Sequence, residues 1–144
     1  MEVFRFDEKQ DDIPTIVLVS HGRVAEALVQ TAKLIAGENI SNVIALCLEE
    51  GDNPSEYRKE LISILEEGKE AKFVMADLYG GTPCNSTLLA AGTVKKNFEI
   101  VSGFNLPMFL EVLSGRESHD IGELLEIAEM AGKEGICKVK EMVL

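Results

Sequence analysis

The sequence lacks the features that mark membrane, secreted and disulfide-rich proteins. No apolar run has the length needed to span a bilayer, and the first residues lack the basic-then-apolar pattern of a signal peptide. The three cysteines are widely spaced and odd in number, so they suggest neither a disulfide framework nor a zinc motif. These absences lead us to expect a soluble, cytoplasmic protein.

Basic residues are also scarce. The chain has 14 lysines and arginines against 25 aspartates and glutamates, which gives a formal net charge of −11. Nucleic-acid binding requires basic side chains to neutralise phosphates, so this balance argues against a nucleic-acid partner. Hydrophobic residues make up 46% of the 144 residues, which is an ordinary globular composition for one domain with a sizeable core.

The chain does contain a regular alternation of short apolar runs and helical patterns. Continuous apolar runs, typical of buried parallel strands, occupy residues 15–20, 43–48, 72–77 and 98–102. Helical patterns occupy 24–36, 54–67, a stretch from about 83, a short stretch through 113, and about 120–131. This order predicts a three-layer α/β fold with a mostly parallel, doubly wound sheet of about four strands.

The two ends of the chain carry different patterns. Residues 1–14 are polar and acidic, and we expect a loose extension, although residues 3–6 also fit an extra edge strand. Residues 136–143 alternate apolar and charged side chains, which predicts a C-terminal edge strand. No linker or repeat divides the remainder, so residues 15–144 are expected to form a single domain.

His21 follows the first apolar run, at the predicted carboxyl end of a buried strand. Ligands of open α/β sheets bind just beyond these strand ends, so the position predicts a site residue. Gly22 leaves space beside the imidazole for a bulky partner. The pattern leaves open whether this histidine is a nucleophile, a base or a metal ligand. His119, the other histidine, precedes a helical pattern in a polar stretch and is expected at the surface.

Asp77 ends the third apolar run much as His21 follows the first. If the two strands are neighbours, the Asp77 carboxylate can accept a hydrogen bond from one ring nitrogen and fix the tautomer. The other ring nitrogen is then free to act as a nucleophile. An ordinary helix-cap or turn aspartate is the alternative interpretation.

The stretch Gly80-Gly81-Thr82-Pro83 predicts an anion site at the start of a helix. The glycines let the backbone approach a ligand, Thr82 suits the N-cap and Pro83 suits the first helical position. The amino end of a helix offers free N–H groups and a positive dipole. Beside a histidine and an aspartate, this pattern predicts a phosphoryl group carried on His21.

Three stretches carry a resemblance to a known family. They are IVLVSHG at 16–22, MADLYGGTPCN at 75–85 and VSGFNLPM at 101–108. On these residues, the chain from about residue 15 resembles the enzyme IIA component of the mannose family of the bacterial phosphoenolpyruvate-dependent sugar phosphotransferase system. The block from Asp77 to Asn85 is specific to this family, whereas the His-Gly turn alone is not.

The resemblance implies a phosphoryl carrier that needs neither a metal nor a cofactor. His21 would take a phosphoryl group from the carrier protein HPr, with Asp77 as its partner, and pass it to a IIB component. Membrane IIC and IID subunits would then move the sugar. The resemblance also implies a homodimer in which an antiparallel strand over 136–143 lies against the partner's sheet.

The resemblance assigns further residues to the site. Those expected around the phosphate are Gly22, Leu78, Tyr79, Gly80, Gly81 and Thr82. Those expected to line the cleft are Arg23, Pro83, Asn85, Asn105 and Pro107. The chain departs from the family at Leu78, where a hydroxyl-bearing residue is common, and at Tyr79, where tryptophan is common. Backbone N–H groups would therefore have to serve in place of a hydroxyl at Leu78.

Three other functions share parts of this pattern. Small tetrapyrrole metal chelatases also place His-Gly after a first parallel strand, but they need further ligands, which His119 would have to supply. The phosphotransferase subunit of dihydroxyacetone kinases shares the fold and the histidine, and the Gly80–Pro83 block argues for the sugar-transport branch instead. A regulatory module, in which phosphorylation of His21 is only a signal, would use every one of the same residues.

Overall fold

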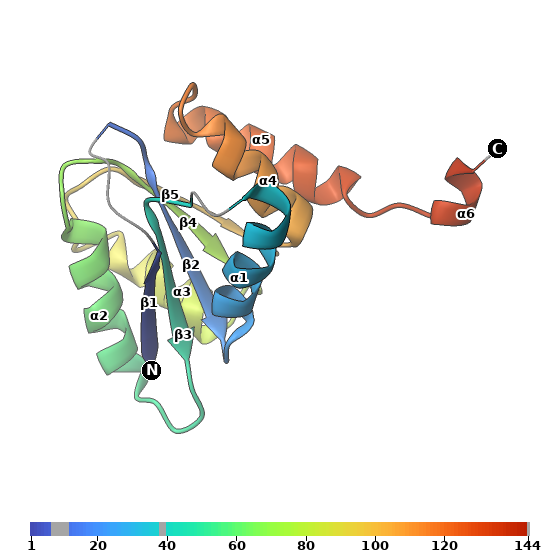
Figure 1. Cartoon of the computed structure of the whole chain (residues 1–144). Coiled ribbons are helices and arrows are strands. Elements are labelled where there is room, and N and C mark those ends of the chain that lie inside the picture. Colours follow the sequence, from blue (N-terminus) through green and yellow to red (C-terminus); the bar gives the residue numbers. More distant parts are fainter. Residues whose placement is uncertain (7–11, 38–39, 144) are drawn as a thin grey trace.

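The computed structural model describes residues 1–6, 12–37 and 40–143, and in these residues it contains a five-stranded sheet (Figure 1). The strands are β1 (Glu2–Phe6), β2 (Thr15–His21), β3 (Val43–Leu48), β4 (Lys72–Ala76) and β5 (Phe98–Ser102). Their order is β1-β3-β2-β4-β5. The pairs from β3 to β5 are parallel, and β1 runs antiparallel to β3. The predicted mostly parallel, doubly wound sheet is confirmed.

Helices cover both faces of the sheet, as the predicted three-layer fold requires (Figure 1). The helices are α1 (Val24–Ala36), α2 (Pro54–Glu66), α3 (Thr82–Ala90), α4 (Leu106–Gly115), α5 (Ile121–Glu134) and the short α6 (Val139–Met142). One face packs against α1, α4 and α5, and the other packs against α2 and α3.

Each central strand is apolar throughout because both of its faces are covered. Ile16 and Leu18 of β2 pack in the core on the α1 side, whereas Val17 and Val19 pack in the core on the α2 side. All four side chains are fully buried. The same alternation places successive side chains at the end of β2 on opposite faces, which matters for the site.

Helix starts follow local chemistry, with one correction. Asn53 caps α2 by accepting hydrogen bonds from the N–H groups of Ser55 and Glu56. Thr82 was expected to be the N-cap of α3, but it is the first helical residue, and the N-cap is Gly81. The main-chain turn before α3 places a glycine at this point, so no side chain caps the helix.

The N-terminal residues correct one expectation about the ends of the chain. Residues 1–14 were expected to be a loose extension, with an extra edge strand over residues 3–6 as the alternative; residues 2–6 form this edge strand, β1, in register with β3 from Glu2↔Cys47 to Phe6↔Val43. Phe6 is buried in the core, and Arg5 forms an ion pair with Glu67 at the end of α2. Residues 7–11, also part of the expected extension, lie outside the described residues.

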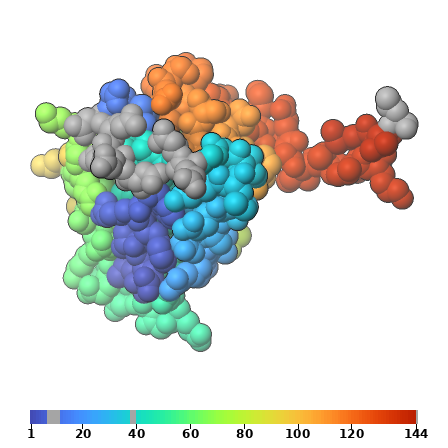
Figure 2. Space-filling model, in the orientation of Figure 1, coloured from blue at the N-terminus to red at the C-terminus, as the bar shows by residue number. Residues whose placement is uncertain are grey.

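The C-terminal residues correct a second expectation about the ends of the chain. Residues 136–143 were expected to form an edge strand, but 139–142 form helix α6, and this C-terminal segment projects away from the body of the molecule (Figure 2). A strand is stable only where its N–H and C=O groups pair with a neighbouring strand, and this segment does not reach a sheet edge of its own chain. The antiparallel strand of the sheet is therefore N-terminal, and exchange of a C-terminal strand in a dimer stays a prediction.

Candidate active site

The candidate active site is built where two adjacent strands end. His21 is the last residue of β2, and Asp77 directly follows β4, which pairs with β2 in parallel. The Asp77 Oδ2 atom lies 2.9 Å from the His21 ring nitrogen Nδ1 and also accepts a hydrogen bond of 2.9 Å from the His21 main-chain N–H. The topology thus creates the histidine–aspartate pair that the sequence predicted.

The hydrogen bond between His21 and Asp77 fixes which ring nitrogen carries the proton. With Nδ1 donating to Asp77, the lone pair lies on Nε2, on the outer edge of the imidazole. The His21 side chain is 46% exposed, whereas Asp77 is only 15% exposed. The second carboxylate oxygen, Oδ1, is buried and accepts no hydrogen bond from the described residues. The two donors of His21 therefore converge on one oxygen, which restrains both its main chain and its ring.

The loop before α3 forms the wall of the site beside the ring. The backbone of Gly81 lies so close that a Cβ atom there would be 2.4 Å from Cε1 and 3.1 Å from Nε2 of His21. Gly80 has a φ of +84°, a left-handed conformation that favours glycine. The Asn85 side chain donates a hydrogen bond of 3.0 Å to the Gly80 carbonyl and so holds the loop to the first turn of α3.

The amino end of α3, which follows Gly81, therefore lies beside the Cε1–Nε2 edge of the imidazole. Thr82, Pro83 and Cys84 form the start of this helix; Pro83 has no N–H, and the N–H groups of Thr82 and Cys84 have no acceptor within the helix. These groups and the helix dipole favour an anion at this point. Four residues predicted around the phosphate or the cleft, Gly80, Gly81, Asn85 and Thr82, thus belong to one turn beside Nε2.

Leu78 and Tyr79 belong to the same loop, but their side chains extend into solvent. They are 58% and 79% exposed. Their contribution to an anion site would come from the backbone, which agrees with the departure from the family pattern at Leu78. In the turn after His21, Gly22 has a φ of +54° and donates from its N–H to the Leu48 carbonyl, which ties this turn to β3.

Arg23 was expected to line the cleft, which stays a prediction, and the described contacts of its guanidinium are with β1 and with Glu49. It is 3.4 Å from carboxylate oxygens of both Glu2 and Glu49, and it stacks 5.2 Å from the centroid of the Phe4 ring. These groups lie on β1 and after β3, whereas Asp77 follows β4 on the other side of β2. The structure therefore uses Arg23 to hold the edge strand.

Asn105 and Pro107 were also expected to line the cleft, and their described contacts are with α5. The Asn105 side chain caps α4 by accepting from the N–H of Met108 and donates to the carbonyl of Gly132. Pro107 packs against Gly135 at the end of α5. A role of these two residues in the cleft stays a prediction.

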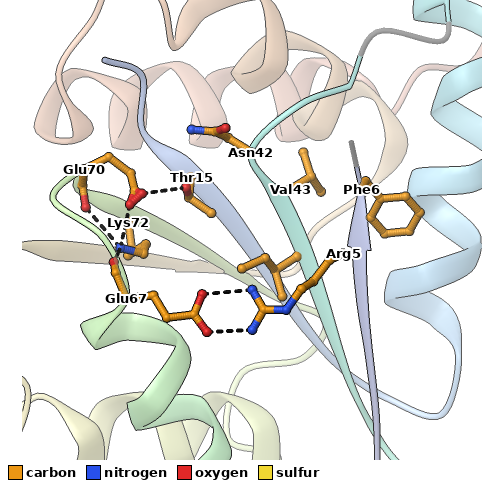
Figure 3. A pocket seen from close by; sticks show the side chains of 9 residues that line it. Arg5, Phe6, Thr15, Asn42, Val43, Glu67, Glu70 and Lys72 are labelled. Carbon is orange, nitrogen blue, oxygen red and sulfur yellow. Dashed lines mark hydrogen bonds and ion pairs between the residues drawn. The ribbon is translucent and has the colours of Figure 1, made fainter. Parts of the chain in front are cut away.

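A separate hollow of about 110 Å³ lies at the opposite end of the sheet, where β2 and β4 begin (Figure 3). Its cationic side chains already face carboxylates. Arg5 forms a two-pronged ion pair with Glu67, and the buried Lys72 ammonium lies 3.3 Å from a Glu70 oxygen. This pairing makes the hollow a structural junction between β1, α2 and β4.

Two features of the described residues bear on the metal-chelatase interpretation and on the expectation that the chain has no membrane-spanning segment. His119 is half exposed, with Nδ1 3.6 Å from Glu123, and the described part of the chain brings no three His, Cys, Asp or Glu side chains together as a metal site. No helix in the same residues is long and apolar enough to cross a membrane.

The fold and the site together define a class: a doubly wound α/β domain with a histidine–aspartate pair at the carboxyl ends of its central strands. A family model described as "PTS system fructose IIA component" matches residues 15–129. The chain therefore belongs to this family of phosphotransferase-system IIA components, which confirms the resemblance seen in the sequence.

Individual relatives support the same assignment. Over 133 residues the chain is 32% identical to the mannose-specific EIIAB component of Escherichia coli (strain K12), an alignment that covers 87% of the chain. It is 33% identical over 117 residues to the fructose-specific EIIA component of Bacillus subtilis (strain 168), covering 77% of the chain and 76% of that relative. The chain spans only 39% of the length of the mannose-specific protein.

A solved structure agrees in fold as well as in sequence. The mannose/sorbose-specific IIA subunit from Enterococcus faecalis superposes with a TM-score of 0.78 at 33% identity, covering 87% of this chain and 93% of that one. The EIIA component from Streptococcus agalactiae gives a TM-score of 0.80 at 26% identity, covering 88% and 98%. The family assignment favours the phosphotransferase interpretation of the site over a metal chelatase.

Proposed function

We propose that this protein is a phosphoryl carrier that accepts a phosphoryl group on Nε2 of His21 from phospho-HPr and passes it to a IIB component. The observation that carries the proposal is the orientation of the ring. Nδ1 lies 2.9 Å from Asp77, and Nε2 lies at the exposed edge beside Gly81 and the start of α3. Family membership supports a role in sugar uptake.

The transfer conserves electrons and protons without a metal or cofactor. The Nε2 lone pair forms a bond to phosphorus while the bond from phosphorus to the histidine of HPr breaks, and that histidine keeps the electron pair. The proton on Nδ1 stays on His21, and Asp77 stabilises the positive charge that the phosphorylated ring acquires. In the second transfer the acceptor on IIB attacks phosphorus, the bond from phosphorus to Nε2 of His21 breaks, and its electron pair returns to Nε2.

Stabilisation of the phosphoryl oxygens falls to the backbone. Attack on phosphorus requires an in-line approach and donors for the equatorial oxygens. The main-chain N–H groups at the start of α3 and the Thr82 hydroxyl are the candidate donors, since the Leu78 and Tyr79 side chains extend into solvent. Preorganised donors of this kind require little rearrangement during the reaction.

The test is the intact mass of the protein after incubation with phosphoenolpyruvate, enzyme I and HPr. The wild type should gain one acid-labile phosphoryl group, and His21→Ala should gain none. Asp77→Asn should slow the transfer by roughly 100-fold or more, because the ring then loses its fixed tautomer and its countercharge. His119→Ala is the matched control and should behave as wild type. A His21→Ala protein that is phosphorylated at the normal rate would exclude the mechanism.

The onward step separates transport from regulation. If purified phosphorylated protein transfers its group to a IIB component, the carrier role stands, and the membrane IIC and IID subunits would act downstream. Retention of the group in the presence of the cognate IIB component would indicate a regulatory module instead. We further propose that the protein is cytoplasmic, that residues 15–144 together with the edge strand β1 form one domain, and that it has no nucleic-acid partner; the family match over residues 15–129, the pairing of β1 with β3 and the net charge of −11 support these assignments.

We also infer a homodimer from the C-terminal segment. Residues 136–143 project from the body, and Ile136, Val139, Met142 and Val143 are all exposed (Figures 1 and 2). Exposed apolar side chains gathered on one projecting segment favour a contact with a second molecule. Strand β5 forms one edge of the sheet and is only half-buried, so it offers a place for that contact.

A further inference from the structure

The hydroxyl of Ser20 lies inside the turn that carries His21. Ser20 is fully buried (0% exposed). Its Oγ accepts a hydrogen bond of 2.9 Å from the main-chain N–H of Ala25 and donates one of 3.1 Å to the carbonyl of Gly22. One side chain therefore joins the end of β2, the turn and the start of α1.

This hydroxyl replaces a helix cap that the turn does not otherwise supply. The N-cap residue of α1 is Arg23, whose side chain makes no capping hydrogen bond and extends toward β1 instead. The N–H of Ala25, at the second helical position, is one of the amides that no helix satisfies internally. Ser20 satisfies it from within the strand, five residues upstream.

Ser20 cannot act on the phosphoryl group directly, because it points to the opposite face of the sheet. Its Oγ lies 4.0 Å from Cys47 Sγ, on the α1 side, whereas the ring of His21 lies against Gly81 and α3. Any influence on the ring therefore passes through the main chain. That main chain is held at two other points, by Gly22 N–H on the Leu48 carbonyl and by His21 N–H on Asp77.

We propose that Ser20 is a positioning residue for phosphoryl acceptance, which rests on the proposed function of His21. Of the three attachments of the turn, the Ser20 hydroxyl is the one that sets the turn against α1. Without it, the buried N–H of Ala25 loses its acceptor and the carbonyl of Gly22 loses a donor, and the turn relaxes to recover a partner for the buried N–H. A displacement of about 1 Å at a reacting group can cost roughly 100-fold in rate, so a small relaxation is sufficient.

The experiment compares Ser20→Ala with Ser20→Thr and with Thr15→Ala. Thr15 provides the matched control because it is buried at the other end of β2 and its hydroxyl donates a hydrogen bond of 3.3 Å to Glu70. Each protein is phosphorylated by phospho-HPr at a temperature where thermal unfolding shows it to be folded. Ser20→Ala should lose roughly 10-fold or more in rate, Thr15→Ala should stay near wild type, and Ser20→Thr should recover rate because it keeps the hydroxyl.

A second measurement does not depend on the reaction. The ¹⁵N signals of the His21 ring in unphosphorylated protein report the population of the Nδ1–H tautomer. Ser20→Ala should reduce that population, and Thr15→Ala should not. Wild-type rate and ring signals in Ser20→Ala would overturn the proposal, as would equal effects of both substitutions. A wild type that accepts no phosphoryl group refutes the proposed function, and the ring signals then still decide the role of Ser20.

Discussion

Gly81 is the residue on which the free edge of the His21 ring most directly depends. A side chain at this position would begin 2.4 Å from Cε1, closer than any non-bonded contact allows. The ring would then have to leave Asp77 or turn Nε2 away from the start of α3. The chemical reason for glycine here is space for an imidazole, because Gly81 itself has an ordinary extended φ of −79°.

Gly81→Ala should therefore slow phosphorylation of His21 by roughly 100-fold, since the reacting nitrogen is displaced. Gly92→Ala is the matched control, because its nearest neighbour would be 3.8 Å from the added Cβ. Rates of phosphoryl transfer from phospho-HPr and thermal unfolding of both variants provide the measurement. A Gly81→Ala protein with the wild-type rate would show that the ring does not need this contact.

At the scale of secondary-structure elements, β1 is attached to the sheet by two kinds of contact. Phe6 is buried in the core on the α1 side, with the Lys33 ammonium 5.1 Å from the centroid of its ring. Arg5 makes a well-aligned but half-exposed ion pair with Glu67. Burial of an aromatic side chain is worth several times more than an exposed ion pair, so the apolar contact should dominate.

Phe6→Ala should lower the free energy of unfolding by about 3 kcal/mol. Arg5→Ala, on the same strand, should lower it by less than about 1 kcal/mol because solvent screens the ion pair. Urea denaturation of the two variants and the wild type measures both values. The assignment of roles is wrong if Arg5→Ala proves the more destabilising substitution.

At the scale of the whole molecule, the C-terminal segment should determine the oligomeric state. Removal of residues 136–144 should convert a dimer to a monomer, because it removes the projecting apolar side chains. Leu34→Ser, which changes an exposed leucine on α1, serves as the control and should leave the dimer intact. Light scattering coupled to size-exclusion chromatography measures both masses. A truncated protein that remains dimeric, or a wild type that is monomeric at micromolar concentration, would contradict the inferred interface.

The elements that the sequence predicted correctly are those with a strong local pattern. Residues 43–48 and 98–102 form strands at the predicted bounds, because continuous apolar runs suit strands covered on both faces. The two ends of the chain lack such a strong pattern and were predicted less well. An edge strand has one neighbour, so its pattern is weak: the edge strand at residues 2–6 was only an alternative to a loose extension, and the strand expected over 136–143 is wrong, since 139–142 form α6.

The active site likewise combines features that the sequence predicted with features that depend on the tertiary structure. Sequence placed His21 and Asp77 at strand ends, but their meeting depends on β2 and β4 being neighbours, which is a property of the topology. The Ser20 hydroxyl carried one available signal, a short polar residue just before a helix start without a capping side chain at Arg23. The contacts of Arg23 with β1 had no local signal.

The sequence by itself therefore determined the alternation of strands and helices, the family and the residues at the strand ends, because these depend on local periodicity and on motif residues. Tertiary structure alone decided which strand ends meet, which terminus completes the sheet, and which remote partners the predicted cleft residues contact. Asn105 and Arg23 illustrate the physical reason: each binds partners remote in sequence, at Gly132 and at Glu2. Such contacts form only when distant segments pack, so no local pattern specifies them.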